Sequence, residues 1–385
     1  MPFDIIIVGA GLSGLVLAER FSSVLQKRVL VLEKRDHIGG NCFDYRDGNG
    51  ILVHKYGPHL FHTSNQAVWE YLSKFTRWHQ YEHKVLSSVD DKLVPLPFNL
   101  NTLYDLYDLR EAEEIEGLLL NKYGYGARVS ILQLRRESQP LLKELAEFIF
   151  NKFFVNYTTK QWGCRVEDIS DEVIERVPVV LSRDDRYFDD IYQGIPTNGY
   201  TAMFKALASS PLITVKYGVD ALTRLRLQGN KVLFDGRKFP GLIFFTGQID
   251  SLFDYSDGEL EYRSLQFVFE EHNKPSFQPV ATVNYPNDYD FTRITEFKNI
   301  LPAATSRTTI VKEFPQDYDR FDDMKNIPYY PVFTHKNKEL FELYNRKLSN
   351  ISNIVPVGRL AQYRYFDMDD AVANALLTFD QFRSA

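Results

Sequence analysis

Cysteine is scarce in this sequence, because only Cys42 and Cys164 occur among 385 residues. Two cysteines provide no disulfide framework of the kind that stabilises small secreted proteins. So few thiols are instead typical of a protein that works in a reducing compartment. We therefore expect a cytoplasmic location.

Long apolar runs are also absent. No stretch of roughly 18 apolar residues occurs, which is about the length that a transmembrane helix needs. The first apolar run, Ile5–Val8, follows no basic segment and passes directly into glycines, so it lacks the features of a secretory signal peptide. The sequence therefore predicts no membrane partner.

An excess of positive charge is the third missing feature. The chain has 45 Lys and Arg residues against 51 Asp and Glu residues, for a formal net charge of −6. Nucleic-acid-binding domains usually carry a basic face, so we expect no nucleic-acid partner. Any anionic ligand must be bound by a few well-placed arginines and not by an overall positive field. We also predict no metal site.

Aromatic residues, in contrast, are plentiful and make up 14% of the chain. The hydrophobic share of 44% is usual for a globular protein, and the length suffices for two or three units with cores of their own. Ordinary packing accounts for most of the rings, but their number hints at ring-lined pockets.

The strongest motif is the glycine-rich turn Gly9-Ala10-Gly11-Leu12-Ser13-Gly14. Gly9 permits a tight turn, Gly11 lets the main chain approach a pyrophosphate, and Gly14 lets the helix pack on the strand. The helix N-terminus offers N–H groups and a partial positive charge to phosphates. Glu33 ends the next strand, where an acidic side chain hydrogen-bonds ribose hydroxyls. Strand, turn, helix and acid together predict dinucleotide binding, but they do not separate NAD from FAD.

Two further segments favour FAD. The segment 35–41 continues from Glu33 and contains a double glycine that could let the backbone approach a long, extended cofactor. Near the other end, residues 357–359 close a strand and residues 367–369 begin a helix, whose N-terminus is suited to the electron-rich edge of a flavin. Early and late segments that serve one cofactor imply a discontinuous domain.

The order of the patterns predicts an α/β protein. Its expected parts are an FAD-binding Rossmann-like domain, an inserted helical bundle and an antiparallel β-sheet domain, because strand patterns flank a long stretch of helical spacing. The expected boundaries are 1–77, 196–255 and 345–385 for the FAD-binding domain, 78–185 for the helical domain with a mobile substrate loop, and 186–195 with 256–344 for the sheet domain.

Five short strings carry a specific resemblance. They are YGPHLFHT at 56–63, YTTKQWG at 157–163, TRITE at 292–296, IPYYP at 327–331, and GRL with YRYFDMD at 358–369. In this order, and over nearly the whole chain, they resemble the bacterial UDP-galactopyranose mutases, which are FAD-dependent.

The resemblance implies a reaction. Members of that family are isomerases, more narrowly intramolecular transferases, that interconvert UDP-galactopyranose and UDP-galactofuranose without net redox change. The reduced form of FAD is active, and the sugar passes through a covalent adduct with it. The resemblance further implies a cytoplasmic homodimer that serves the synthesis of cell-wall and surface polysaccharides.

A diphosphate leaving group calls for arginines, because the guanidinium stays charged and donates hydrogen bonds in a fork. By resemblance the pair is Arg176, in a loop that closes over the substrate, and Arg293, in a strand. His62 is carried over as lying beside the flavin. Arg176, Arg293 and His62 form the predicted catalytic set, and no acid–base role is assigned to His62 or His59.

The uracil ring calls for a flat partner, and four aromatic residues lie between positions 153 and 162. Phe153 and Tyr157 share a face if this segment is helical. From spacing alone we would interpret this cluster as core packing. The resemblance implies instead that the ring of Tyr157 stacks on the uracil and that Trp162 lies near the sugar. It also matches Tyr187, Tyr329 and Tyr365 to positions that contact the diphosphate, His59 to one near the sugar, and Asp367 to one near the sugar or flavin edge.

Two sets of site residues summarise these predictions. The predicted substrate-binding set is Phe153, Tyr157, Thr158, Trp162, Arg176, Tyr187, Arg293, Tyr329, Tyr365, Asp367, His59 and His83. The predicted cofactor-binding set is Gly9, Gly11, Leu12, Ser13, Gly14, Glu33, Lys34, Arg35, Gly40, Asn41, His59, Arg359, Asp367 and Met368.

Some features depart from the family, and alternatives stay open. Many bacterial members have Asn where His83 aligns, so an N-acetylated or otherwise modified UDP-hexose is an alternative substrate. The stretch 104–140 matches no part of the family closely. A flavin amine oxidase or desaturase is a further alternative, although such enzymes usually carry arginine after the double glycine, where this chain has Asn41. The last alternative function is a non-enzymatic, FAD-dependent sensor of nucleotide-sugars.

Overall fold

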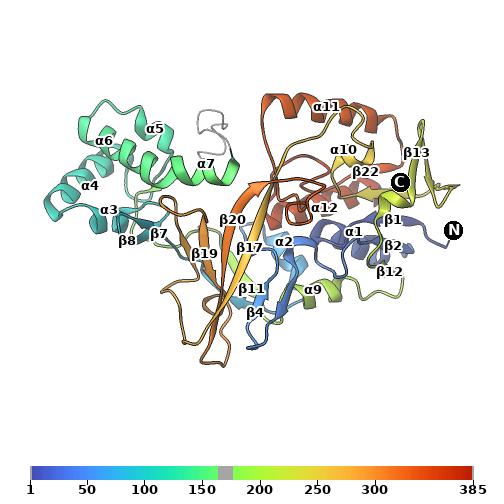
Figure 1. Cartoon of the computed structure of the whole chain (residues 1–385), viewed down its shortest axis with the longest axis horizontal. Helices are drawn as coiled ribbons and strands as arrows, with labels where there is room; N and C mark the ends of the chain where they lie inside the picture. Colours follow the sequence, from blue (N-terminus) through green and yellow to red (C-terminus); the bar gives the residue numbers. More distant parts are fainter. Residues whose placement is uncertain (1, 164–176, 384–385) are drawn as a thin grey trace.

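A computed structural model describes residues 2–163 and 177–383 of the chain. Figure 1 shows a lobe of helices on one side, long β-strands in the middle, and a parallel sheet near both termini on the other side. Among the described residues, no helix combines the length and apolar character needed to cross a membrane.

The parallel sheet combines segments that are far apart in the chain. Its strands, in spatial order, are β12 (Ile213–Lys216), β2 (Val29–Leu32), β1 (Ile5–Val8), β16 (Leu242–Phe245) and β22 (Ile354–Pro356). The central β1 pairs with β2 on one side and with β16 on the other. The nearly continuous aliphatic burial of β1 and β2 is expected of central strands in a parallel sheet that is covered on both faces.

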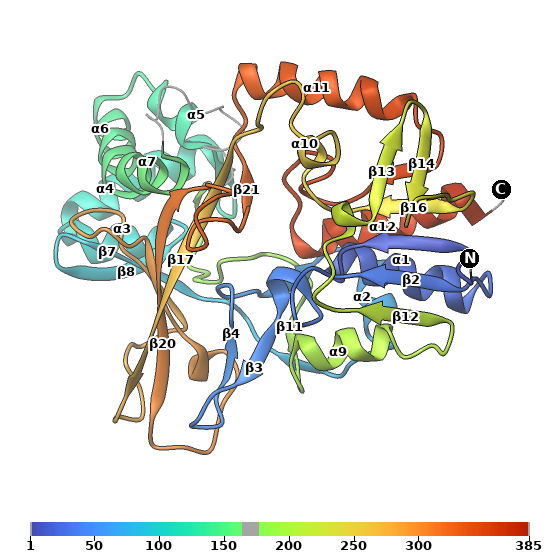
Figure 2. The ribbon, with the colours of Figure 1, turned by 45° about the vertical axis from the view of Figure 1, so that its right-hand side comes forward.

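Helices cover both faces of this sheet. Their bounds are α1 (Leu12–Ser23), α2 (Gln66–Leu72), α9 (Tyr200–Leu207), α10 (Ile249–Leu252), α11 (His335–Ser349) and α12 (Met368–Arg383). Residues of α1, α9 and α12 share one core with Ile5 and Ile7, whereas α10 and α11 share another with Ile6. Figure 2 shows α11 and α9 on opposite sides of the sheet. Side chains alternate between the two faces of β1, so this strand contributes to two separate hydrophobic cores.

The helical lobe has a core of its own. Its elements are α3 (Leu100–Leu106), α4 (Leu109–Tyr123), α5 (Ile131–Arg135), α6 (Pro140–Ile149), a π-helix (Phe150–Val155), and α7 (Asn156–Trp162). The stretch 103–120 belongs to two helices, because the Asp108 side chain accepts hydrogen bonds from the backbone N–H groups of Arg110 and Glu111 and so caps the second of them, α4. The π-helix keeps Phe153 on the side of the lobe core.

The central sheet has seven strands, and all of its neighbours are antiparallel except the pair β18 and β7. Its order is β21 (Tyr330–Pro331), β17 (Tyr262–His272), β20 (Thr308–Asp317), β19 (Arg293–Glu296), β18 (Thr282–Asn284), β7 (Val85–Val89) and β8 (Lys92–Leu96). Strands β7 and β8 come from the segment 78–185, so that segment supplies one edge of the sheet as well as helices.

Short elements connect these layers. They are the hairpin β3 (Asp44–Arg46) and β4 (Leu52–His54); the sheet of β5 (Phe61–Thr63), β11 (Tyr192–Pro196) and β6 (Trp78–Gln80); the sheet of β13 (Leu225–Gln228), β14 (Lys231–Phe234) and β15 (Arg237–Lys238); the pair β9 (Arg128–Val129) and β10 (Val179–Val180); and 3₁₀ turns at Gly40–Cys42, Ala221–Thr223 and Phe297–Asn299. The predicted class, an α/β Rossmann-like domain with added helices and an antiparallel sheet, is confirmed. The boundaries between the three parts stay a proposal.

Candidate active site

A cavity of about 480 Å³ lies where α7, the seven-stranded sheet and the start of α12 meet. Every predicted substrate-binding residue that the structure describes lines it. These residues are Phe153, Tyr157, Thr158, Trp162, Tyr187, Arg293, Tyr329, Tyr365, Asp367, His59 and His83. His62, Arg359 and Met368 also line the cavity. Arg176 lies outside the described residues, and the roles of all these residues stay predictions.

Arg293 is a cation held between two polar neighbours. Its Nη2 donates a hydrogen bond of 2.7 Å to the hydroxyl of Tyr157, and its Nε lies 3.5 Å from a carboxylate oxygen of Glu313. Antiparallel pairing of β19 with β20 puts Arg293 directly opposite Glu313. Burial raises the pKa of Glu313, and Arg293 opposes that shift. Burial alone would lower the pKa of Arg293. Glu313 and nearby tyrosines outweigh this effect and raise the pKa to well above its ordinary value. Arg293 therefore stays protonated.

Several buried polar atoms in the cavity wall have no hydrogen-bond partner among the described residues. They are Gln161 Oε1, Asn284 Oδ1, Glu313 Oε1 and the Tyr329 hydroxyl. A buried polar group without a partner costs free energy, typically about 1–3 kcal/mol. The wall is therefore suited to a polar ligand that offers both donors and acceptors.

A cluster of tyrosines surrounds another arginine of the cavity wall, Arg359. The rings of Tyr330 and Tyr365 are stacked with centroids 6.1 Å apart, and the Arg359 guanidinium lies 5.3 Å and 5.1 Å from those centroids. Arg359 also donates a hydrogen bond of 3.2 Å to the carbonyl of Tyr329. The Tyr365 hydroxyl donates to Asp367 at 3.0 Å. These contacts bind the segment before α12 to the sheet side of the cavity.

His62 is held in one orientation. Its Nδ1 lies 2.7 Å from a carboxylate oxygen of Asp190, and its ring stacks on Phe188 with centroids 3.6 Å apart. Asp190 also accepts a hydrogen bond of 2.8 Å from the hydroxyl of Ser64. The pairing of β5 with β11 brings the segment after Tyr187 next to His62. A histidine fixed in this way can present its other ring nitrogen in a defined direction.

His59 and His83 are neutral rings in the cavity wall. Burial, with the nearby His54, lowers the pKa of His59 to about 3. Burial, with the nearby Arg293 and His62, lowers the pKa of His83 to about 3. The Nδ1 of His83 lies 3.1 Å from the hydroxyl of Tyr81. A neutral imidazole can donate or accept a hydrogen bond without adding charge, which suits contact with sugar hydroxyls.

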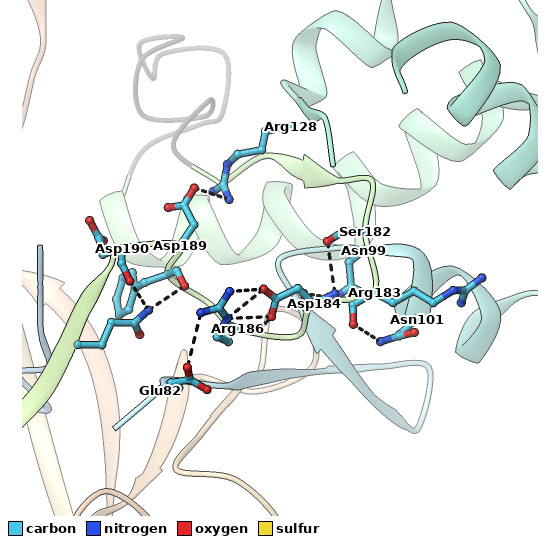
Figure 3. A network of polar contacts seen from close by, with 12 residues as sticks. Glu82, Asn99, Asn101, Arg128, Ser182, Arg183, Asp184, Arg186, Asp189 and Asp190 are labelled. Atoms are coloured by element: carbon cyan, nitrogen blue, oxygen red, sulfur yellow. Dashed lines mark hydrogen bonds and ion pairs between the residues drawn. The ribbon is translucent and has the colours of Figure 1, made fainter. Parts of the chain in front are cut away.

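Polar contacts tie the segment 182–190 to the rest of the chain, as Figure 3 shows. Arg128 of β9 forms an ion pair of 3.1 Å with Asp189, and both residues line the cavity. Arg186 pairs with Asp184 at 2.6 Å. These ion pairs are exposed, and each contributes little to stability. The pair of Arg128 with Asp189, and the contact of Arg186 with Glu82 at 3.5 Å, join the segment that carries Tyr187 to neighbouring parts of the chain.

The glycine turn has the conformation that a pyrophosphate site requires. Gly9 has φ +101°, in the left-handed region that favours glycine. A Cβ at Gly14 would lie 2.2 Å from the carbonyl oxygen of Gly9, so only glycine lets α1 pack this closely. The carboxylate of Glu33 accepts hydrogen bonds from the backbone N–H groups of Ala10 at 2.8 Å and Arg35 at 2.9 Å. The acid of the motif therefore lies against the turn.

Early and late segments of the chain converge at this turn. A Cβ at Gly40 would lie 3.1 Å from the Cα of Gly11, and a Cβ at Gly358 would lie 3.0 Å from the hydroxyl of Ser13. Gly40 and Gly358 both have positive φ. Glycine at these two positions therefore lets an early and a late segment pack closely against the turn, which fits the glycine-rich backbone of a dinucleotide site.

The other members of the predicted cofactor set differ in their surroundings. Arg35 lies over the ring of Tyr56 at 4.3 Å and donates a hydrogen bond of 2.8 Å to Asn41. Its Nη1 is buried without a partner among the described residues, which suits an additional anionic or polar ligand. Leu12 is buried in the core under the sheet, so only its backbone can face a cofactor. Lys34 is exposed, and no hydrogen bond between described residues joins it to this set.

Sequence reasoning missed three residues that contact the predicted site: Glu313, Phe188 and Asp190. Glu313 had a detectable signal, because it is in phase with the core residue Val311 in the period-two pattern of β20. A carboxylate at such a position suggests a buried cation partner. Phe188 and Asp190 had no such signal, since their contact with His62 depends on the pairing of β5 with β11.

The fold defines an α/β protein with a Rossmann-like domain, and its cavity is lined by polar and aromatic side chains. Residues 7–75 match the family model of the NAD(P)-binding Rossmann-like domain, and residues 152–365 match that of UDP-galactopyranose mutase. The chain is 36% identical to UDP-galactopyranose mutase of Mycoplasma genitalium, over 99% of this chain and 95% of that protein. It is 34% identical to dTDP-fucopyranose mutase of Escherichia coli, over 97% and 96%. A solved structure of reduced UDP-galactopyranose mutase superposes with a TM-score of 0.74 at 18% identity, over 100% of this chain and 94% of that one. The chain belongs to the UDP-galactopyranose mutase family and is an isomerase.

Proposed function

We propose that this enzyme is an FAD-dependent mutase that interconverts the pyranose and furanose forms of UDP-galactose, with reduced FAD as the active form. The observation that carries the proposal is the position of Arg293. This permanently charged guanidinium lies in the cavity wall, hydrogen-bonded to Tyr157 and paired with the buried Glu313. Such a group suits the diphosphate of a nucleotide-sugar, whose charge must be met at every stage of the reaction.

The neighbours of Arg293 supply the remaining recognition. Tyr157 offers a flat ring for the uracil, and Trp162 of the same helix lies beside the sugar position. Tyr187, Tyr329 and Tyr365 have hydroxyl groups for the phosphates. The neutral rings of His59 and His83 face the hexose as hydrogen-bonding groups. Arg176 is proposed as the second cation on the diphosphate.

The residues around the glycine turn fit FAD. The glycine backbones and the N-terminus of α1 would hold the pyrophosphate, Glu33 a ribose, and Arg35 with Asn41 the adjoining part of the chain. His59, Arg359, Asp367 and Met368 line the cavity and would border the flavin ring, with His62 beside it. When bound, reduced FAD supplies the nucleophile for the anomeric carbon. The protein itself orients the sugar and excludes water.

The decisive experiment measures conversion and redox balance together. The purified enzyme is incubated with UDP-galactofuranose, with and without dithionite, and the products are separated by chromatography. We expect UDP-galactopyranose to form with reduced flavin only, and no electron acceptor to be consumed. Consumption of one acceptor per product would favour an oxidase or desaturase, and bound FAD with no conversion in either state would favour a sensor.

The nucleotide-sugar itself has a second candidate, dTDP-fucopyranose, because one relative of similar identity, 34% against 36%, is named for that substrate. His83 and its hydrogen bond with Tyr81 lie in the cavity wall and bear on this choice. Comparing kcat/KM for UDP-galactofuranose, its N-acetylated analogue and dTDP-fucofuranose assigns the substrate, because specificity is the ratio of these values. We further propose that the enzyme is a cytoplasmic homodimer, which sedimentation equilibrium can test.

A further inference from the structure

Lys160 of α7 makes an unusual set of contacts. Its ammonium nitrogen lies near four backbone carbonyl oxygens of one loop. These oxygens belong to Tyr285 at 2.7 Å, Tyr289 at 2.8 Å, Asn287 at 3.2 Å and Phe291 at 3.3 Å. An ammonium has three N–H donors, so the loop wraps around the whole cation. We name the residues 285–291, which connect β18 with β19, the clamp loop.

The clamp loop has a second connection to the same helical region. The side-chain amide of Asn156 donates a hydrogen bond of 3.0 Å to the side-chain oxygen of Asn287. The amide of Asn287 donates in turn to the carbonyl of Lys152 at 3.2 Å. Lys160 and Asn287 therefore join α7 and the preceding π-helix to the seven-stranded sheet. In Figures 1 and 2, α7 lies beside the sheet at this point.

The elements joined by this contact carry the predicted nucleotide-binding groups. Tyr157 lies one helical turn before Lys160, on the same side of α7. Arg293 begins the strand directly after the clamp loop, two residues beyond Phe291. The hydrogen bond between Arg293 and Tyr157 spans the two elements. A shift of the loop against the helix would therefore change the spacing between the arginine and the stacking ring.

We propose that Lys160 is a positioning residue for nucleotide binding: its ammonium fixes the clamp loop against α7 and so sets the distance between Arg293 and the aromatic residues of that helix. The proposal rests on the proposed function. Lys160 does not line the cavity, so it acts through Arg293 and Tyr157 and not by touching the substrate. Burial lowers the pKa of Lys160 to about 8, and Asp288 and Asp290 oppose that shift. The ammonium is thus protonated at neutral pH.

The chain contains a matched control for this contact. Lys298, in the 3₁₀ turn after β19, also directs its ammonium at backbone carbonyls, those of Pro275, Thr305 and Arg307. Lys298 joins loops away from the cavity lining. Replacing either lysine removes one charge and several hydrogen bonds to carbonyls. Of the two lysines, only Lys160 connects the elements that carry Arg293 and Tyr157.

The test compares Lys160→Met, Lys298→Met and wild-type enzyme with reduced flavin. We expect Lys160→Met to raise KM for the nucleotide-sugar, and the Kd for UDP, about tenfold with a smaller change in kcat, as expected when uniform binding is lost. Lys298→Met should keep the wild-type KM and Kd. A wild-type KM and Kd in Lys160→Met, or an equal rise in Lys298→Met, would overturn the proposal. If wild-type enzyme itself fails to convert the substrate, the proposed function fails instead, and the Kd for UDP still tests Lys160.

Two further measurements address folding and charge. Asn287→Ala removes the second connection at a half-buried position and should raise KM about threefold, so this variant tests the clamp loop if Lys160→Met does not fold.

In Lys160→Ala, added propylammonium should lower the raised KM, whereas 1-propanol and sodium chloride at equal concentration should not. Failure of propylammonium to lower KM, or equal rescue by 1-propanol, would contradict the requirement for a cation in the clamp loop.

Discussion

At the scale of single residues, the site depends on an ion pair with one buried member. Arg293 and Glu313 face each other across β19 and β20; Glu313 is buried, whereas the Arg293 side chain is 30% exposed. Removing one member of such a pair leaves an uncompensated buried charge, whereas a charged ligand can complete it. The pair thus keeps Arg293 in place when no phosphate is bound.

The replacement Arg293→Ala should lower kcat/KM by about 100-fold or more, because the lost interaction stabilises the charged leaving group. Arg293→Lys should recover only part of the loss, since an ammonium cannot donate in a fork to the phosphates and Tyr157 together. Steady-state kinetics with reduced flavin measure both variants. The flavin absorption spectrum of each variant should stay that of the wild type, and loss of bound flavin in Arg293→Ala would contradict a role confined to the substrate.

At the scale of elements, α9 takes its N-terminal cap from another part of the chain. Its own N-cap residue is Gly199, which has no side chain to accept hydrogen bonds. The carboxylate of Asp44, in β3, accepts instead from the backbone N–H of Tyr200 at 2.6 Å and of Thr201 at 2.8 Å. The cap thereby joins the hairpin near the glycine turn to a helix that covers the parallel sheet.

Replacing Asp44 with Ala should lower the free energy of unfolding by about 1–3 kcal/mol, because two buried N–H groups lose their acceptor. Asp44→Asn should cost less, since its amide oxygen can still accept from one of them. Urea unfolding with saturating cofactor measures the difference. Equal stability of Asp44→Ala and wild type would show that the cap is unimportant.

Elements whose signal is local were predictable from the sequence. The glycine turn, β1, β2 and α6 follow from backbone chemistry and from hydrophobic spacing along adjacent residues. Strands β7 and β8 were missed inside a stretch assigned to helices, because their stability depends on β18, almost 200 residues later in the chain. Helix α11 was missed because few of its residues are apolar, although Thr334 caps its start.

The same distinction applies to the site. Motif strings led to residues that line the cavity, such as Arg293 and Tyr157, whose predicted roles depend on a ligand. They could not identify Asp190, because its contact with His62 depends on the pairing of distant strands. They could not identify the partners of Lys160 either, because these are backbone atoms, which any sequence provides.

At the scale of the whole molecule, three histidines with lowered pKa values make stability depend on pH. Burial lowers the pKa of His54 to about 4 and contributes to values of about 3 for His59 and His83. In the unfolded chain these rings titrate near about 6.5. Below that pH the unfolded state binds more protons than the folded state, so stability must fall as the pH is lowered.

We expect each histidine to contribute a loss of about 1 kcal/mol for each pH unit below 6.5. Urea unfolding between pH 7 and pH 5 measures the total slope. His54→Gln should reduce that slope, because its side-chain oxygen can still accept the hydrogen bond that His59 N–H donates to His54 without titrating. An unchanged slope in His54→Gln would contradict a buried, neutral His54.

The order of strands in the parallel sheet also constrains how the protein emerges from the ribosome. The central β1 is translated more than 200 residues before its neighbour β16, and the edge strand β22 starts only at residue 354. During most of translation the nascent chain holds an incomplete sheet with unpaired edges, which are prone to association with other chains. A chaperone that shields residues 5–32 until β16 has been made would therefore raise the yield of folded enzyme, and premature termination before residue 354 should give aggregates and not a smaller working protein.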